Sequence, residues 1–509
     1  MTSYPVHSPA ELQTACARVQ AGDVVLVHAG CYATPSTLTK KRGSLDRPIV
    51  IRMADDGWVS GGKPPDPAWG GGDPAKDSPP KPGPTDFAFL VIDDCAHIAI
   101  DGLRIRDCWP SIFFVKDTDH LTLRNCWLRN GTYAIFAKGT PTSHLLIEDN
   151  EWRQDDSPEH LLWTQIDWAR AHGGEGADGA YRYFNGGFLS SKNIRGNVVV
   201  RRNRIMDAYN GIRLKADDPL PKVDQMPRVN ADIHIVDNDF IRIRDNPVEP
   251  EAAAFNWHVR HNRLLDCHAW FSFDGVTGGY WYFYGNTGRF DTRQGTGGIE
   301  GHTMGRVLKL SYETQPPDPA SVGVPIFPWF VFNNSWHLRC PLIGGANPIV
   351  PAVGEGPDFT AHLDFFNNAF AWCDPGRYGN WVCEPIEIIH FLDFPRSTDT
   401  HFDYDISDRS DFVAYFQDAN WGEANGLTTR RPLFEDLQTG KFALAMGSDA
   451  HRSGWVRDVP QPGSGGGAPL RKQADGTLNR GAIQDYGLIQ VPNLEAQTAA
   501  LLTEMGVEV

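Results

Sequence analysis

Short segments in which apolar and polar residues alternate recur through the chain, with turn-forming residues between them. The segments 97–102, 120–125 and 144–150 each begin with His, and their starts lie 23 and then 24 residues apart. Alternation with a period of two predicts β-strands that bury one face. A fixed repeat of about 20 to 50 residues is typical of a solenoid, so we expect a coil of strands. Similar segments continue the repeat at 197–200, 232–235, 256–259, 279–282, 329–332 and 361–364.

An asparagine returns a few residues into each repeat. The set comprises Asn125, Asn150, Asn203, Asn238, Asn262, Asn286, Asn334 and Asn368. Stacked at one corner of a coil, these side chains can hydrogen-bond to each other and to the turning backbone. The sequence therefore predicts an all-β fold, a right-handed parallel β-helix, in which residues one repeat apart lie about 4.8 Å from each other.

Segments outside the repeat predict how the coil is closed. Ser8-Pro9-Ala10-Glu11 has the form of a helix-capping box, so an N-terminal capping helix should cover the first turn of the coil. A second helix is expected over 493–505, on the outside of the coil. Long intervals between repeats predict loop insertions that wall a groove, at 155–192, 216–230 and 291–327.

These features divide the chain into three parts. Residues 1–87 hold the capping helix, the first strands and a loop rich in Pro and Gly. Residues 88–395 form the β-helix core with its groove. Residues 396–509 form irregular last turns and a closing segment.

Composition and charge narrow the classes of partner. The 509 residues include 51 Gly, 37 Pro, 16 Trp and 27 Phe, which is typical of a turn-rich β protein. A net charge of -16 argues against nucleic acid and acidic membrane surfaces as partners. It also disfavours a polyanionic substrate, unless a cation or a local patch of Lys and Arg receives it.

The nine cysteines are scattered and form no Cys-x-x-Cys pair, so neither a zinc site nor a disulfide framework is predicted. The N-terminal segment Met1–Pro5 lacks the basic and apolar regions of a secretory signal, and no apolar run is long enough to span a membrane. We expect a cytoplasmic protein, or a secreted or periplasmic one whose signal has been removed.

The candidate chemistry lies on the strands that follow the corner asparagines. One column of side chains is predicted to run through Phe114, Phe136, Arg213, Glu249 and Ser272, and a second through Lys116, Lys138, Lys215, Glu251 and Asp274. Side chains two residues apart share one face of a strand, so Glu249 and Glu251 should point to the same side. A surface row of ion pairs would also explain these columns.

The third carboxylate, the flanking insertions and the nearby aromatic residues favour a catalytic site over such a row. The predicted catalytic residues are Glu249, Glu251, Asp274, Arg213, Lys215, His258 and His268. The predicted substrate-binding residues are Trp270, Trp281 and Tyr209.

The chain opens with Leu12, Gly22-Asp23, Gly30-Cys31-Tyr32, Gly43 and Pro48-Ile49. This pattern resembles polysaccharide lyase family 6, the chondroitinase B and alginate lyase type of β-helix enzyme. In that family a strand ending in Ile-Arg precedes a Glu-x-Glu pair that holds calcium, and Ile212-Arg213 and Glu249-Pro250-Glu251 stand in those places. The resemblance implies calcium bound by Glu249 and Glu251, with Asn210 as a further ligand. The catalytic Lys and Arg of the family are not matched, because Ala252–Asn256 and Ser272–Asp274 stand at those positions.

Three functions remain open. A polysaccharide lyase acting on a uronate-containing glycan would use Arg213 and Lys215 to neutralise the uronate, with His258 or His268 as base. A glycoside hydrolase or glycosyl-transferring enzyme would use Glu249 or Glu251 with Asp274. A non-catalytic glycan-binding protein would use the groove alone. The family-like frame makes the lyase the preferred hypothesis.

Overall fold

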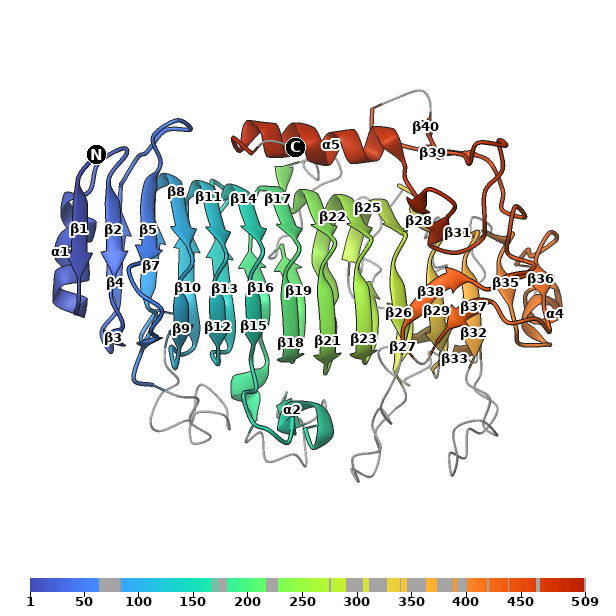
Figure 1. Cartoon of the computed structure of the whole chain (residues 1–509), viewed down its shortest axis with the longest axis horizontal. Helices are drawn as coiled ribbons and strands as arrows, with labels where there is room; N and C mark the ends of the chain where they lie inside the picture. The colour runs from blue at the N-terminus through green and yellow to red at the C-terminus, as the bar shows by residue number, and fades with distance from the viewer. Residues whose placement is uncertain are drawn as a thin grey trace, which may run out of the picture.

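The strands of the computed structural model wind into a parallel β-helix, which confirms the predicted fold (Figure 1). The structure describes residues 1–63, 83, 85–166, 170–171, 181–216, 228–273, 276–289, 305–310, 327–338, 340–345, 363–372, 388–390, 401–418, 421–437, 439–463 and 467–507. Between β2 and β33, successive turns of the coil contribute strands to three parallel sheets, called A, B and C here.

Sheet A contains β1 (Ser3–Val6), β2 (Val24–Val27), β5 (Ile49–Met53), β8 (Ala96–Asp101), β11 (Asp119–Arg124), β14 (Ser143–Glu148), β17 (Gly196–Arg201), β20 (Ala231–Val236), the second half of β22 (Val248–Arg260), β25 (Val276–Tyr284), β28 (Trp329–Phe332), β31 (Leu363–Phe366) and β34 (His401–Asp403). Sheet B contains β3 (Gly30–Cys31), β6 (Val59–Ser60), β9 (Arg104–Arg106), β12 (Trp127–Arg129), β15 (Glu151–Arg153), β18 (Arg204–Ala208), β21 (Asp239–Ile243), β23 (Arg263–Cys267), β26 (Thr287–Arg289), β29 (Ser335–Leu338), β32 (Ala369–Trp372), β35 (Ile406–Ser407) and β36 (Leu427–Thr428).

Sheet C contains β4 (Ser36–Thr39), β7 (Leu90–Asp93), β10 (Ser111–Lys116), β13 (Tyr133–Lys138), β16 (Gly187–Lys192), β19 (Asn210–Lys215), the first half of β22, β24 (Ala269–Phe273), β27 (Arg306–Leu310), β30 (Ile343–Gly345) and β33 (Ile389–His390). Strand β22 pairs with β19 at its beginning and with β20 further along, so it joins sheet C to sheet A within one strand. The strand does so around Ala252, whose φ of 68° is a left-handed backbone conformation.

A row of hydrogen-bonded amides fills the corner between sheets A and B. In each case Oδ1 of one asparagine accepts from the backbone N and from Nδ2 of the asparagine one turn earlier, as for Asn203 and Asn238, both at 3.0 Å. The row runs through Asn150, Asn203, Asn238, Asn262, Asn286, Asn334 and Asn368 and ends on Asp405.

Asn125 does not belong to this row, contrary to the prediction. Cys126 occupies the corner position of its turn, and its backbone N donates to Oδ1 of Asn150 at 2.9 Å. Asn125 is exposed one residue earlier, with a left-handed φ of 56°, and donates instead to Asp101. The preceding residue of other turns, such as Asp149, has the same left-handed φ of 56°.

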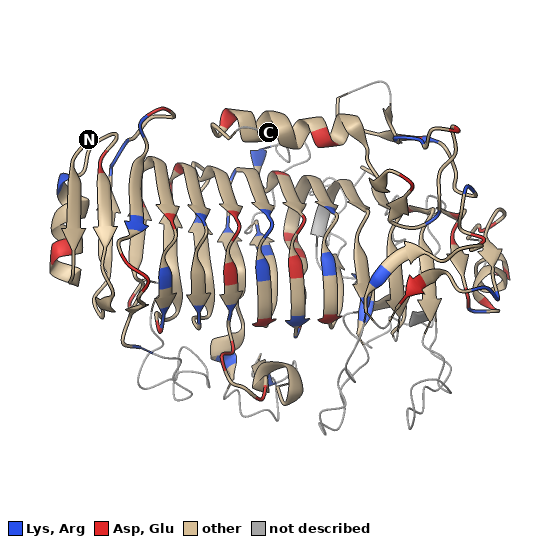
Figure 2. Ribbon diagram, viewed as in Figure 1, with Lys and Arg blue, Asp and Glu red and all other residues tan. Residues whose placement is uncertain are grey.

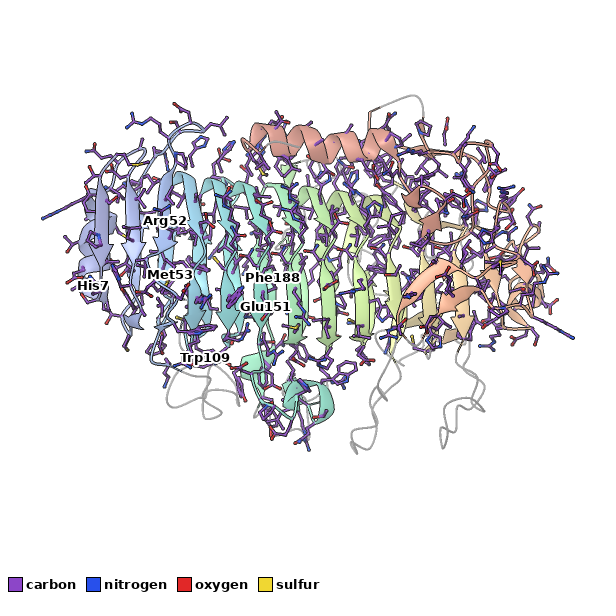
Figure 3. All side chains as sticks on the ribbon, viewed as in Figure 1. His7, Arg52, Met53, Trp109, Glu151 and Phe188 are labelled. Carbon is purple, nitrogen blue, oxygen red and sulfur yellow. The ribbon has the colours of Figure 1, made fainter. Side chains whose placement is uncertain are left out.

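The interior is a continuous apolar core to which alternate residues of each strand contribute. Ile212 and Leu214 are buried inside, and Phe188 packs inside against Trp152 with ring centroids 6.0 Å apart (Figure 3). The alternate residues on the outer faces carry charges of both signs on neighbouring turns (Figure 2). Strand parity therefore decides which side chains are available for chemistry.

Two helices cover the coil as predicted. Helix α1 (Pro9–Arg18) lies at the N-terminal end, and Oγ of Ser8 accepts from the backbone N of Glu11 at 3.3 Å. Helix α5 (Pro492–Glu504) lies along the outside of sheet A (Figure 1), where Leu501 and Leu502 pack on Leu146 and Val199.

Smaller elements complete the described chain. They are α2 (Leu161–Thr164), the 3-10 helix η2 (Arg182–Phe184), α4 (Phe412–Asp418) and the strands β37 (Phe434–Asp436), β38 (Lys441–Leu444), β39 (Asp458–Pro460), β40 (Gly467–Pro469), β41 (Ile483–Gln484) and β42 (Gly487–Leu488). Among the helices of the described residues, none has the length and hydrophobicity to cross a bilayer.

Long connections enter and leave sheet C. Residues 154–186 and 290–305 connect sheet B to sheet C, and residues 216–230 and 311–328 connect sheet C to sheet A. The corner between sheets A and B holds only two residues in the turn of Asn125 and Cys126. The predicted insertions 155–192 and 291–327 were too long, because each ends in or contains a strand of sheet C, β16 and β27.

Candidate active site on sheet C

The predicted charged columns lie on the outer face of sheet C. Arg213 pairs with Glu249 and Lys215 pairs with Glu251 across β19 and β22. The turn before contributes Ser190 and Lys192, which the sequence analysis had assigned to an insertion. The turns after contribute Ser272 and then Lys309.

Arg213 lies between the two glutamates. Its Nε donates to Oε1 of Glu251 at 2.9 Å, its Nη2 contacts the same oxygen at 2.5 Å, and its Nε lies 3.3 Å from Oε2 of Glu249. Nη1 donates to Oδ1 of Asn185 at 3.3 Å, and Nζ of Lys215 lies 3.4 Å from Oε2 of Glu251. One guanidinium thus holds both carboxylates, with Glu251 in the closer contact.

Glu249 is the buried member of the pair, with its side chain 7% exposed. Burial raises the pKa of Glu249 to about 7, Arg213 acts in the opposite direction, and the negative charges of Glu251 and Asp245 raise it further. A carboxyl group with this pKa exchanges a proton near neutral pH, which suits general acid–base catalysis.

A row of lysines borders the pair. Lys116, Lys138, Lys192 and Lys215 occupy successive turns of sheet C at the same register, and Glu251 follows them. Neighbouring strands lie about 4.8 Å apart, so the row places positive charges at regular intervals along the coil. Acidic residues lie at both ends of the row, because Nζ of Lys116 is 3.4 Å from Asp93 and from Asp117, and Nζ of Lys215 is 3.4 Å from Glu251.

Three residues of the site were not predicted from the sequence, namely Tyr133, Ser190 and Lys192, whereas Ser272 lies beside Glu249 as predicted. Tyr133 lies on β13, where its ring packs against Phe136 at 4.9 Å and where it interacts electrostatically with Arg213 and Glu251. Burial raises the pKa of Tyr133, so its phenol keeps its proton at neutral pH. The hydroxyls of Ser190 and Ser272 are buried beside Arg213 and Glu249 and have no hydrogen-bond partner among the described residues. If β16 had been recognised as a strand of the repeat, its register would have identified Ser190 and Lys192 as neighbours of Arg213 and Lys215.

His258 was wrongly assigned to the site. It lies in the second half of β22, on sheet A, where it stacks on His234 at 4.4 Å and contacts Oδ1 of Asn256 at 2.8 Å. Burial lowers the pKa of His258 well below its usual range. His268 lies in the bend between β23 and β24, directly before Ala269 and four residues before Ser272, the position beside Glu249.

The prediction that three aromatic residues bind substrate is also wrong, because all three are buried. Trp270 and Trp281 are fully buried inside the coil, where their indole nitrogens donate to the carbonyls of Cys267 and Ala254. Tyr209 is fully buried in a cluster with residues of the 154–186 connection. None of the three presents a face to a groove on sheet C.

The predicted third carboxylate, Asp274, lies outside the described residues. Asn210 is buried on the inner face of β19, and its Oδ1 accepts from the backbone N of Asn246 at 2.9 Å. It therefore does not join Glu249 and Glu251 as a ligand. Calcium takes about six to eight oxygen ligands, whereas the two glutamates here share the guanidinium of Arg213. The described oxygens do not fit a calcium ion.

Asp119, His120 and His144 form a second cluster of potential metal ligands on sheet A. Nδ1 of each histidine lies 2.8 Å from an oxygen of Asp119, and the two rings stack 4.3 Å apart at an angle of 8°. Parallel rings direct their nitrogen lone pairs side by side and not toward one point. The cluster is a hydrogen-bonded stack rather than a chelating site.

No sequence profile of a protein family matches the chain, and no curated protein sequence matches it. Solved structures with a similar fold include a variant of the PL6 family alginate lyase AlyGC, with 11% identity, coverage of 80% of this chain and 51% of that chain, and a TM-score of 0.44. A mannuronic acid specific family 6 lyase from human gut microbiota shows 12% identity, coverage of 84% and 91%, and a TM-score of 0.43. The GH136 lacto-N-biosidase from Eubacterium ramulus shows 9% identity, coverage of 76% and 64%, and a TM-score of 0.40. The chain spans about half the length of the AlyGC chain, and these similarities concern the fold alone.

Proposed function

We propose that this protein is a carbohydrate-active enzyme that cleaves a uronate-containing polysaccharide on sheet C by β-elimination. The observation that carries the proposal is the buried Glu249, which Arg213 contacts beside the end of a row of lysines and whose pKa is raised to about 7. The lysines would bind the carboxylates of an acidic glycan along the coil.

The proposed reaction uses residues of β13, β19 and β22, which lie within four successive turns of sheet C. Arg213 and Lys215 neutralise the carboxylate of the uronate, which makes the proton on the adjacent carbon more acidic. Glu249 in its ionised form takes this proton, and the electron pair forms a carbon–carbon double bond as the bond to the glycosidic oxygen breaks. Tyr133 donates a proton to the leaving oxygen, because a phenol carries its proton at neutral pH.

Glycoside hydrolysis is the second candidate, and one specific observation favours it. Glu249 has a raised pKa whereas Glu251 is held by both Arg213 and Lys215. Two carboxyl groups in contrasting environments are the usual arrangement of a general acid and an ionised partner. The lysine row favours the lyase, because a neutral glycan would have no use for it.

An activity screen separates these functions. The protein is incubated with uronate-containing polysaccharides and with neutral polysaccharides, and both ultraviolet absorbance and new reducing ends are measured. Absorbance from an unsaturated uronate identifies a lyase, and reducing ends without that absorbance identify a hydrolase. Retention of the glycan with neither product identifies a binding protein. We expect a chelator to leave the activity unchanged, because Arg213 supplies the positive charge between the glutamates.

A further inference from the structure

A cavity of about 640 Å³ lies between sheet A and α5, on a different sheet from the proposed catalytic site. The coil contributes Arg201, Arg202 and Arg260 to its lining, and the C-terminal segment contributes Arg471 and Glu495. Four arginines thus line one cavity. The helix α5 that covers it carries acidic residues, shown in red in Figure 2.

Arg260 is buried in this cavity without an ion pair among the described residues. Only 8% of the residue is exposed, yet no carboxylate oxygen of the described chain lies within 4.0 Å of its guanidinium. Nη1 lies 3.3 Å from Nδ1 of His261, Nη2 donates to Oγ1 of Thr498 at 3.3 Å, and Nε has no hydrogen-bond partner in the part of the chain that the structure describes. A buried charge without an ionic partner is costly, so buried arginines are ordinarily paired.

The residues that contact Arg260 are neutral. Burial and the charge of Arg260 lower the pKa of His261 to about 3. Nε2 of His261 lies 2.7 Å from the carbonyl of Ile489, so this nitrogen carries the proton and Nδ1 faces Arg260 as an acceptor. The surroundings therefore orient the guanidinium without neutralising it.

Arg471 adds a second guanidinium of the same kind. Its Nη1 contacts Oε1 of Gln490 at 2.5 Å and its guanidinium lies 4.6 Å above the ring of Tyr486. No carboxylate oxygen of the described residues lies within 4.0 Å of it either. Arg201 differs, because Glu148 lies 2.8 Å from its Nη2.

Two carboxyl groups also line the cavity, those of Asp237 and Glu495. Burial raises the pKa of each, and Arg260 acts in the opposite direction on both. Oε1 of Glu495 is buried without a hydrogen-bond partner. Glu495 thus limits how strongly the cavity attracts an anion, which makes it a useful position for a test.

We propose that this cavity binds a small oxyanion, a carboxylate or phosphate group, through Arg260 and Arg471. Guanidinium groups bind such anions through two parallel charge-assisted hydrogen bonds, and the unpartnered Nε of Arg260 is one of the donors required. The volume accommodates a sugar acid or a sugar phosphate as well as a free ion. Because Thr498 of α5 contacts Arg260, a bound anion would also stabilise the contact of α5 with the coil.

Isothermal titration calorimetry of the full chain at low ionic strength tests the proposal, with sodium phosphate, sodium glucuronate and glucose as probes. We expect one equivalent of phosphate, glucuronate or both to bind, and glucose not to bind. Arg260→Gln and Arg471→Gln should each weaken binding roughly tenfold or more. Glu495→Gln should tighten it, because a negative charge is removed from the cavity.

Two controls make the result specific. Arg263→Gln removes one positive charge from sheet B, where Arg263 pairs with Asp239 at 2.6 Å, and should leave binding unchanged. Glu249→Gln should also bind normally, so failure of the proposed catalytic function would not affect this test. If Arg260→Gln does not fold, Arg471→Gln decides alone. Absence of binding by either anion, equal binding of glucose, or wild-type affinity in the folded arginine variants would overturn the proposal.

Discussion

Arg213 holds Glu251 through two nitrogen atoms, with Nε and Nη2 at 2.9 and 2.5 Å from the same carboxylate oxygen. The geometry depends on the planar guanidinium, because a lysine ammonium cannot place two donors in this way and still reach Glu249. The ion pair of Arg213 with Glu251 therefore fixes the position of the positive charge that the proposed reaction needs.

Arg213→Lys should therefore lower the turnover number roughly 100-fold or more, although the charge is conserved. Arg204→Lys is a matched control on sheet B, where Arg204 lies 3.7 Å from Glu151, and should retain wild-type turnover. Turnover is measured on whichever polysaccharide the parent protein cleaves. Wild-type turnover in Arg213→Lys would remove Arg213 from the mechanism.

The pH dependence of the rate should follow Glu249. As a base it acts only in its ionised form, so the rate should rise with pH around its pKa of about 7. Glu251→Gln removes a negative charge that raises the pKa of Glu249, so the midpoint in this variant should move to lower pH. A rate that falls above pH 7 would contradict elimination and indicate that Glu249 acts as the acid of a hydrolase.

The row of hydrogen-bonded asparagines at the corner between sheets A and B should contribute strongly to the free energy of unfolding. Asn262→Ala leaves the backbone N–H of Asn238 and the carbonyl of Ile235 without their side-chain partner. We expect the free energy of unfolding to fall by about 1 to 3 kcal/mol for each buried group left unpaired. Asn125→Gly is the control at an exposed position outside the row, because glycine also adopts the left-handed φ of 56° found there, and chemical denaturation should show a change within about 0.5 kcal/mol. Equal losses in the two variants would show that the row contributes nothing of its own.

A second buried pair, Asp405 and Glu423, should make stability depend on pH. Burial raises the pKa of Asp405, and the charge of Glu423 raises it further. Burial also raises the pKa of Glu423 from 4.5 to about 7. Between these pH values the folded protein holds a proton that the unfolded chain releases, so the contribution of Glu423 to stability falls as pH rises from about 4.5 to about 7. Thermal melts of Glu423→Gln should show a smaller loss of stability over this range than the parent. An identical pH dependence would mean that Glu423 ionises normally.

Strand parity and the repeat length made much of sheet C predictable. Glu249 and Glu251 share a face because they are two residues apart, and Arg213 lies one turn earlier because the repeat fixes the register. The same rule failed for His258, because β22 passes from sheet C to sheet A around Ala252 without the loop that would mark a change of sheet in the sequence.

The buried aromatic residues show a second limit. Trp270 and Trp281 belong to strands in which aromatic residues occupy successive positions, so alternation gives no sign of which face is buried. Ser190 and Lys192 were missed for a different reason, since a long insertion precedes them and hides the repeat. Tyr133 became a candidate only when its contact with Phe136 and its interaction with Arg213 were known.

The most direct test of the central claim compares the parent protein with Glu249→Gln on uronate-containing polysaccharides, with ultraviolet absorbance of the unsaturated product as the signal. Glutamine keeps the size of the side chain but cannot take a proton, so we expect absorbance to rise with the parent and to slow by about 100-fold or more in the variant. Equal rates in the two proteins, or cleavage by the parent without any unsaturated product, would contradict elimination at Glu249.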